Sequence, residues 1–163
     1  MSKRETYIQR YEASREKMRE IVKLAEENQV IYEPWRMKEV LDHLTGWDDA
    51  IIASITSLLK GEAPATPAAH GIDAYNKATV STREALPYAL SQREWEASRV
   101  ELLRLLRVMS EEQLHQPFAL PWGSEGTIET VVEIFSTHEE EHAQEIGEII
   151  RRGRQPREAA GGL

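Results

Sequence analysis

The sequence contains no cysteine. Disulfide bonds, thiolate metal ligands and a cysteine nucleophile are therefore excluded, and the composition fits a reducing cytoplasm, where we expect the protein to reside. No stretch approaches the roughly 20 consecutive apolar residues that a transmembrane helix needs. The first ten residues, MSKRETYIQR, also lack the apolar core of a signal peptide, so we expect no membrane partner.

Basic residues and strand-like patterns are also scarce. The 163 residues include 20 lysines and arginines against 28 acidic residues, which gives a net charge of -8. Because the basic residues form no stripe, we expect no nucleic acid partner. No segment shows sustained alternation of apolar and polar residues with β-branched enrichment, which argues against strands. The length suits a single domain with a sizeable core.

Amphipathic helices are what the sequence does contain. Apolar residues recur at intervals of three and four in four long segments, residues 2–28, 36–60, 91–109 and 127–152. Connections that contain proline separate them, and a shorter helix is expected over residues 72–84. We therefore predict an all-α four-helix bundle whose long crossover region contains this extra short helix.

Local signals predict one helix start and the limits of the domain. Ser91 and Glu94 have the spacing of a capping box, which predicts the start of the third long helix. We expect one helical bundle domain over residues 1–153. Residues 154–163 contain almost nothing to bury, so they are expected to form a flexible tail.

The last long helix carries the most informative pattern. On a helical wheel that starts at Ile128, residues follow at about 100° intervals, so His138 falls at about 280° and His142 at about 320°. Both rings therefore lean toward the apolar face of the helix. Two histidines four residues apart on one helical face can chelate a single divalent cation.

His43 is the candidate third ligand. It lies at the edge of the apolar stripe of the 36–60 helix, so all three imidazoles come from apolar faces that must meet in the core. Imidazole suits Zn, Ni, Fe or Cu, of which we favour Zn or Ni, and three protein ligands leave a coordination position for water or substrate. The alternative is that each histidine is a core residue satisfied by a hydrogen bond.

Glu139 is the candidate catalytic residue. Its wheel position, about 20°, lies among the core residues instead of on the outer acidic face. A carboxylate turned inward beside two ligand histidines could act as a general base for water. It could equally orient an imidazole or reach an opening at the end of the bundle, and Glu145 is a weaker candidate for orienting a histidine.

Residues in and beside the loops complete the set of candidates. Trp122 could form part of a pocket wall or plug the end of the bundle. Tyr75 and Asn76 could supply polar groups to a pocket. His70 and His115 lie in or beside loops, and we expect both to face solvent.

The run His138-Glu-Glu-Glu-His142 also matches the zincin pattern H-E-x-x-H, in which the glutamate is a base on the same helix. The extended zincin pattern continues with a glycine and a third histidine, but Glu145 and Glu148 occupy those positions. A zincin would also need a sheet edge to hold its peptide substrate, and no strand is predicted. We therefore reject a peptidase.

Residues 35–48, WRMKEVLDHLTGWD, resemble the second-helix signature of the DinB-like bundles, W-x-x-K-[DE]-x-[LIV]-x-H-L-x-x-W-[DE]. His138 and His142 match the histidine pair in that family's last helix, and one early and two late histidines follow the family's order. The resemblance extends from the first helix to the end of the last. The stretch over residues 71–87 looks most like the ClbS/DfsB branch.

The resemblance implies a bundle with a long crossover, often dimeric, in which His43, His138 and His142 hold one divalent metal at an open site. Characterised members include S-transferases and isomerases that use small thiols such as mycothiol or bacillithiol. Others are regarded as metal-dependent hydrolases, and the ClbS type protects against a genotoxic metabolite.

By resemblance we expect a metal-dependent enzyme that acts on a small-molecule substrate by thiol transfer or hydrolysis. A low-molecular-weight thiol is a candidate cofactor beside the divalent metal, and a homodimer is a candidate assembly. The alternative is a non-catalytic protein that binds a small molecule for protection.

Overall fold

The structure, a computed structural model, describes residues 1–154. Its four long helices are α1 (Lys3–Leu24), α2 (Met37–Leu59), α4 (Tyr88–Val108) and α6 (Ile128–Arg154). The connections hold two shorter helices, α3 (Ile72–Ser81) and α5 (Glu111–His115). The predicted all-α four-helix bundle with an extra short helix in the crossover is confirmed. The predicted flexible tail lies outside the described residues, apart from Arg154, which belongs to α6.

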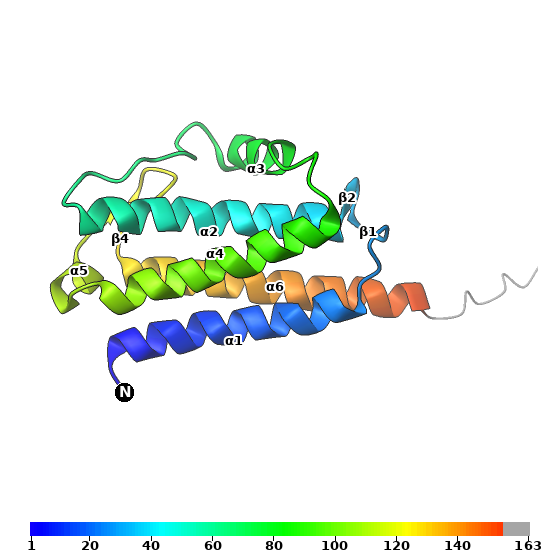
Figure 1. The fold of residues 1–163 in the computed structure, drawn as a ribbon, viewed down its shortest axis with the longest axis horizontal. Coiled ribbons are helices and arrows are strands. Elements are labelled where there is room, and N and C mark those ends of the chain that lie inside the picture. Colours follow the sequence, from blue (N-terminus) through cyan, green and yellow to red (C-terminus); the bar gives the residue numbers. More distant parts are fainter. Residues whose placement is uncertain (155–163) are drawn as a thin grey trace, which may run out of the picture.

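The order of the helices in space differs from a simple up-and-down arrangement (Figure 1). α1 and α6 lie side by side and run in the same direction, and α2 and α4 form a second parallel pair. Because two parallel neighbours cannot be joined by a tight turn, the chain crosses the length of the bundle between α2 and α4, and α3 lies in this crossover. Glycine at position 46 lets α3 approach α2 closely, since a Cβ there would lie 2.6 Å from the Thr79 side chain.

The start of α4 corrects one sequence prediction. The helix begins at Tyr88, directly after Pro87, so Ser91 is not its N-cap. Proline suits the first positions of a helix because its fixed φ is helical and its missing N–H needs no partner there. Ser91 instead lies fully buried in the first turn of α4.

Two short antiparallel ribbons lie in connections where no strand was predicted. β1 (Val30–Tyr32) pairs with β2 (Trp35–Arg36) between α1 and α2, and β3 (Phe118–Ala119) pairs with β4 (Glu125–Gly126) before α6. Strands of two or three residues are too short to produce a period-two pattern, so sequence periodicity could not predict them. The first ribbon places Tyr32 and Trp35 beside the histidines of α2 and α6.

A buried layer of charge divides the core of the bundle. Each long helix contributes one residue to it, namely Arg15, Asp48, Arg99 and Glu139, and all four side chains are at most 4% exposed. One apolar cluster includes Tyr11 of α1, and a second cluster includes Met18 of the same helix. Each of the other three long helices also contributes residues to both clusters. We call these four residues the buried charge layer.

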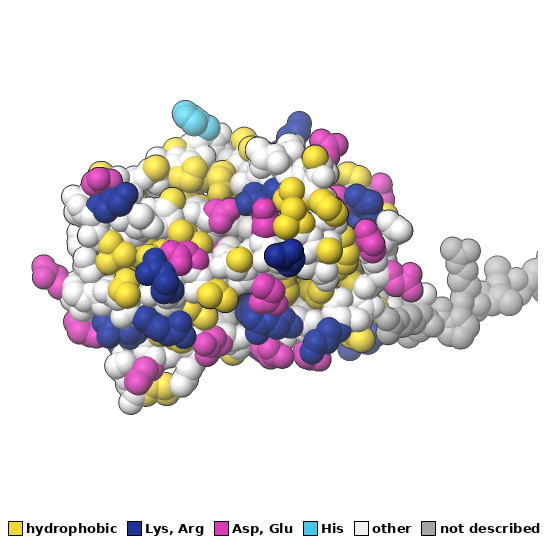
Figure 2. Space-filling view, in the orientation of Figure 1, with side chains coloured by type: hydrophobic (Ala, Val, Ile, Leu, Met, Phe, Trp, Pro, Cys, Tyr) yellow, Lys and Arg dark blue, Asp and Glu magenta, His cyan; other side chains and the backbone are white. Residues whose placement is uncertain are grey.

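The surface carries both signs of charge. Figure 2 shows lysine and arginine side chains interspersed with acidic ones over the face seen in Figure 1. Within residues 1–154, none of the helices is long and apolar enough to cross a membrane.

Candidate metal centre

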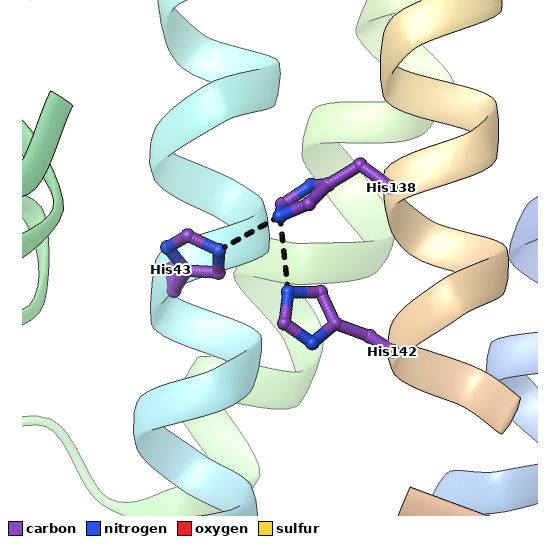
Figure 3. A group of neighbouring side chains, drawn as sticks. All are labelled: His43, His138 and His142. Carbon is purple, nitrogen blue, oxygen red and sulfur yellow. Dashed lines mark hydrogen bonds between the residues drawn. The ribbon is translucent and has the colours of Figure 1, made fainter. Parts of the chain in front are cut away.

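The structure brings together the three histidines that the sequence singled out. His43 comes from α2, and His138 and His142 come from successive turns of α6 (Figure 3). Their Nε2 atoms converge, with 3.2 Å between His43 and His138 and 3.0 Å between His138 and His142. One ligand atom from each ring lies within 4.8 Å of the other two.

This spacing suits a single metal ion. Nitrogen donors about 2.05 Å from one ion lie about 2.9 Å apart at octahedral angles and about 3.3 Å apart at tetrahedral angles. Both Nε2 separations fall in this interval. Within residues 1–154, no fourth side chain joins the cluster, so the protein would leave at least one coordination position to a small molecule.

The histidines are held in the neutral form that a metal ion requires. Burial, with smaller effects from His138 and His142, lowers the pKa of His43 to about 3. Burial and the neighbouring His138 ring lower the pKa of His142 to about 4. Burial also lowers the pKa of His138. At neutral pH the rings therefore present lone pairs instead of positive charge.

The orientation of His142 is fixed by Tyr32 and Glu145. The Tyr32 hydroxyl donates to Glu145 Oε2 at 2.7 Å and lies 2.8 Å from His142 Nδ1. Because burial and the hydrogen bond to Glu145 raise the pKa of Tyr32, the hydroxyl keeps its proton and uses it on the carboxylate. Its oxygen can then only accept from the His142 Nδ1–H, which leaves Nε2 as the free lone pair.

His43 is held by packing. Its ring lies against Trp35, with centroids 5.3 Å apart, and it is 4% exposed. Its Nδ1 atom has no hydrogen-bond partner among the residues that the structure describes. The ring is held by its packing against Trp35 and by its contacts with His138 and the Asn76 side chain.

A cavity of about 580 Å³ opens beside the histidines. His43 and His138 form part of its wall, and the rings of Trp47, Trp122 and Phe135 form another part. Its volume lies in the range of small-molecule sites, roughly 300–1,000 Å³. The cavity therefore connects the candidate ligand atoms to a space that can hold a small organic molecule.

Of the other candidates considered from sequence, Trp122 and Asn76 line this cavity. Asn76 accepts a hydrogen bond from Trp47 Nε1 at 2.8 Å, whereas the Tyr75 hydroxyl donates to the Gly46 carbonyl. His70 and His115 are both exposed, as predicted.

Glu139 has partners other than those considered from sequence. Its carboxylate is 1% exposed and accepts from Arg15 Nε at 2.7 Å and from Trp95 Nε1 at 3.3 Å. Arg99 Nη2 lies 2.9 Å from its other oxygen, and Ser14 also donates to that oxygen. Glu139 is absent from the wall of the cavity. A catalytic role for Glu139 stays a prediction, but these contacts make it a member of the buried charge layer.

Several residues that shape the site were missed from sequence. Tyr32 and Trp35 lie on a ribbon too short to predict. Arg15 lies between the core positions Tyr11 and Met18, at helical spacing from both, and this placement of an arginine was a usable signal. Asp48 ends the signature of residues 35–48, so its type was visible although its buried partners were not.

Comparison with known proteins agrees with this architecture. The structure of YfiT from Bacillus subtilis matches with a TM-score of 0.71 at 20% sequence identity, over 94% of this chain and 90% of that one. YfiT is described as a probable metal-dependent hydrolase with an unusual four-helix bundle topology, and at this identity the likeness establishes the fold. No curated protein matches the sequence. The family model for the DinB superfamily matches residues 10–146, a span that contains all three histidines, and the chain belongs to that superfamily.

Proposed function

We propose that this protein is a divalent-metal-dependent enzyme that hydrolyses a small molecule, with His43, His138 and His142 as the metal ligands. The observation that carries the proposal is the convergence of three neutral Nε2 atoms from two helices beside a cavity whose wall includes His43 and His138. Imidazole donors favour Zn or Ni, among other transition metals, over Mg or Ca. The description of YfiT as a probable metal-dependent hydrolase supports the same class of reaction.

In this proposal the ion activates the reacting groups, and the protein residues orient the ligands and shape the cavity. A divalent ion supplies a Lewis acid, which polarises a carbonyl or phosphoryl oxygen and makes water or a thiol easier to deprotonate. Tyr32 and Glu145 hold His142 with its Nε2 toward the site. Trp47, Trp122 and Phe135 shield one side of the cavity from water, which strengthens electrostatic interactions there.

Thiol transfer is the second reaction that this site could support. Because the chain has no cysteine, any thiol would have to enter as a small-molecule co-substrate. The cavity of about 580 Å³ offers room for a substrate beside the ion. A purely protective, sequestering role would use the same cavity without turnover.

Metal content tests the proposal first. Protein purified without a histidine tag and dialysed against zinc should contain about one equivalent of metal by elemental analysis, and His43→Ala should contain little. His70→Ala is the matched control, because His70 is exposed and lies outside the cluster. Absence of bound zinc or nickel from the wild-type protein would overturn the proposal.

His142→Ala separates an enzyme from a sequestering protein. If the protein is an enzyme, this variant should keep its fold, by circular dichroism, and lose turnover of a hydrolysable substrate. A sequestering protein should keep its affinity for the ligand in the same variant, because the cavity wall does not include His142.

Tyr32→Phe should weaken zinc binding by about 10–100-fold, because the hydroxyl that fixes the His142 ring is lost. Tyr88→Phe is the control, since Tyr88 is also half-buried but its hydroxyl has no hydrogen-bond partner among the described residues. Competition with a chromophoric chelator measures both affinities. Equal affinities in the two variants would show that Tyr32 does not orient the ligand.

A further inference from the structure

The glutamates of α6 fall into two groups. The helix carries seven, and five of them have a charged or hydrogen-bonding partner. Glu129 pairs with Lys3, Glu139 with Arg15 and Arg99, Glu140 with Lys17 and Arg10, Glu145 with Tyr32, and Glu148 with Arg152. Within residues 1–154, Glu133 and Glu141 have no ion pair and no hydrogen bond, and these are the two that line the cavity.

The geometry of α6 places both carboxylates on one side of the cavity. Glu133, Thr137 and Glu141 follow at intervals of four, so they form a single stripe on the helix, and all three line the cavity. At 1.5 Å per residue, the two glutamates lie about 12 Å apart along the axis. No lysine or arginine lines this cavity.

One basic side chain beside this stripe, Arg10, already has partners. Arg10 Nη2 lies 3.4 Å from Thr137 Oγ1 and 3.6 Å from Glu140 Oε2, and Arg10 is not part of the cavity wall. Arg10 shares Glu140 with Lys17, so both cations lie at that carboxylate outside the cavity wall. Glu133 and Glu141 are exposed, and they are the charged side chains that line the cavity.

Aromatic rings form another part of the wall of the same cavity. Trp47 lies 5.4 Å from Phe135 and 6.1 Å from Trp122 between ring centroids, and Trp122 and Phe135 are 6.0 Å apart. Three rings at these distances pack against one another and form one aromatic wall, and a flat apolar group can lie against the side of this wall that faces the cavity. The negative face of an aromatic ring also attracts an organic cation.

We propose that the cavity selects a small organic cation with a flat apolar body. The body would lie against the wall formed by Trp47, Trp122 and Phe135, and the positive charge would lie near Glu133 or Glu141. The same two carboxylates would repel an anion of equal size. This inference rests on the proposed function for the reaction, because the histidines would face the bound molecule, but binding selectivity can be measured without any metal.

Three probes with one naphthalene body test the selectivity. They are (naphthalen-2-ylmethyl)trimethylammonium, 2-naphthalenemethanol and naphthalene-2-sulfonate, none of which is a strong metal ligand. Calorimetric titration of the chelator-treated full chain at low salt should give about tenfold tighter binding for the ammonium than for the alcohol. The sulfonate should bind weakest of the three.

Neutralising the carboxylates supplies the matched comparison. The double variant Glu133→Gln, Glu141→Gln should bind the ammonium about fivefold to tenfold more weakly and leave the alcohol unchanged. Glu148→Gln is the control, because it removes an exposed charge from the same helix outside the cavity. Circular dichroism establishes that all variants keep their fold.

Equal or tighter binding of the alcohol or sulfonate, no binding of any probe, or an unchanged ammonium affinity in the double variant would each overturn the inference. Repeating the titrations on zinc-loaded protein separates the two proposals. Zinc binding without preference for the ammonium would leave the proposed function intact and reject the inference. Preference for the ammonium in a protein that binds no zinc or nickel would support the inference and reject the proposed function.

Discussion

Replacing Asp48 by alanine should lower the free energy of unfolding by about 3–5 kcal/mol, because it leaves two buried guanidinium groups with one carboxylate between them. Asp48 accepts from Arg15 Nη2 at 3.0 Å, from Arg99 Nη2 at 3.2 Å and from Ser98 Oγ at 3.1 Å. Its side chain is 3% exposed, and those of Arg15 and Arg99 are at most 4% exposed. Water therefore cannot replace the lost charge.

The ionisation of this carboxylate follows from its neighbours. Burial raises the pKa of Asp48, but the charges and hydrogen bonds of Arg99 and Arg15 outweigh burial and hold the pKa below its usual value. The buried charge layer is thus neutral as a whole, with two guanidiniums against the carboxylates of Asp48 and Glu139. Removing one member breaks that balance in a region of low dielectric.

Urea unfolding measures the effect, and the adjacent residue provides the control. Asp49 pairs with Arg83, but its side chain is 49% exposed, so Asp49→Ala should cost less than about 1 kcal/mol. Asp48→Ala should lower the melting temperature by roughly 6–20 °C for a chain of this size. A loss below 1 kcal/mol for Asp48→Ala, or equal losses for both variants, would show that the layer does not depend on charge pairing.

The same comparison clarifies Glu139. Because Glu139 belongs to the buried charge layer, Glu139→Ala should lower the free energy of unfolding of the protein by an amount similar to that of Asp48→Ala. A catalytic base would instead change turnover with little change in stability. The hydrogen bonds from Arg15, Arg99 and Trp95 favour the stabilising role.

Local pattern was enough to predict the helices and the histidine pair, since helix periodicity and i, i+4 spacing are properties of one segment. It also indicated that Glu139 faces inward. The local pattern could not identify the partners of Glu139, because Arg15 and Arg99 come from two other helices and their placement depends on the packing of α1 and α4. Binary patterning treats an arginine at a core position as a defect, whereas here opposite charges from four helices compensate one another.

The parallel packing of neighbouring helices and the ribbon before α2 could not be predicted from local sequence patterns either. Amphipathic faces show that four helices pack together, but not that α1 neighbours α6 and α2 neighbours α4. The contact between Tyr32 and His142 joins residues 110 positions apart through a strand of three residues. Such a contact depends on the assembled bundle, so no sequence window could reveal it.

Acidifying the metal-free protein from pH 7 to pH 5 should cost about 2 kcal/mol of stability for His43 and a similar amount for His142. Burial lowers the pKa of His43 from 6.5 to about 3 and that of His142 from 6.5 to about 4. Between these folded values and 6.5, the unfolded chain binds more protons than the folded protein. This stability is therefore complete above pH 6.5 and is lost as the pH falls.

His138 contributes with the same sign, because burial also lowers its pKa. Urea unfolding at pH 7, 6 and 5 in the presence of a chelator measures the total loss. Many carboxylates also titrate in acid, so the histidine contribution has to be taken from a difference between variants. The double variant His43→Gln, His142→Gln should bind nearly two fewer protons on unfolding at pH 5, so its free energy of unfolding should depend less on pH. The variant His70→Gln, at an exposed position, should show the same dependence as the wild type.

Zinc provides an independent check on the same groups. An ion that binds the neutral imidazoles adds stability in proportion to the logarithm of its concentration over its dissociation constant. Burial lowers the pKa of His43 to about 3 and that of His142 to about 4, so protons do not compete for these two nitrogens between pH 7 and pH 5. The stability that zinc adds should therefore change little over this range in the wild type and in His70→Gln. If the double variant showed the same dependence on pH and zinc as the wild type, His43 and His142 would be neither the titrating groups nor the ligands. The cluster would then be a packed core of rings, and the selectivity of the cavity would rest on its aromatic and acidic walls alone.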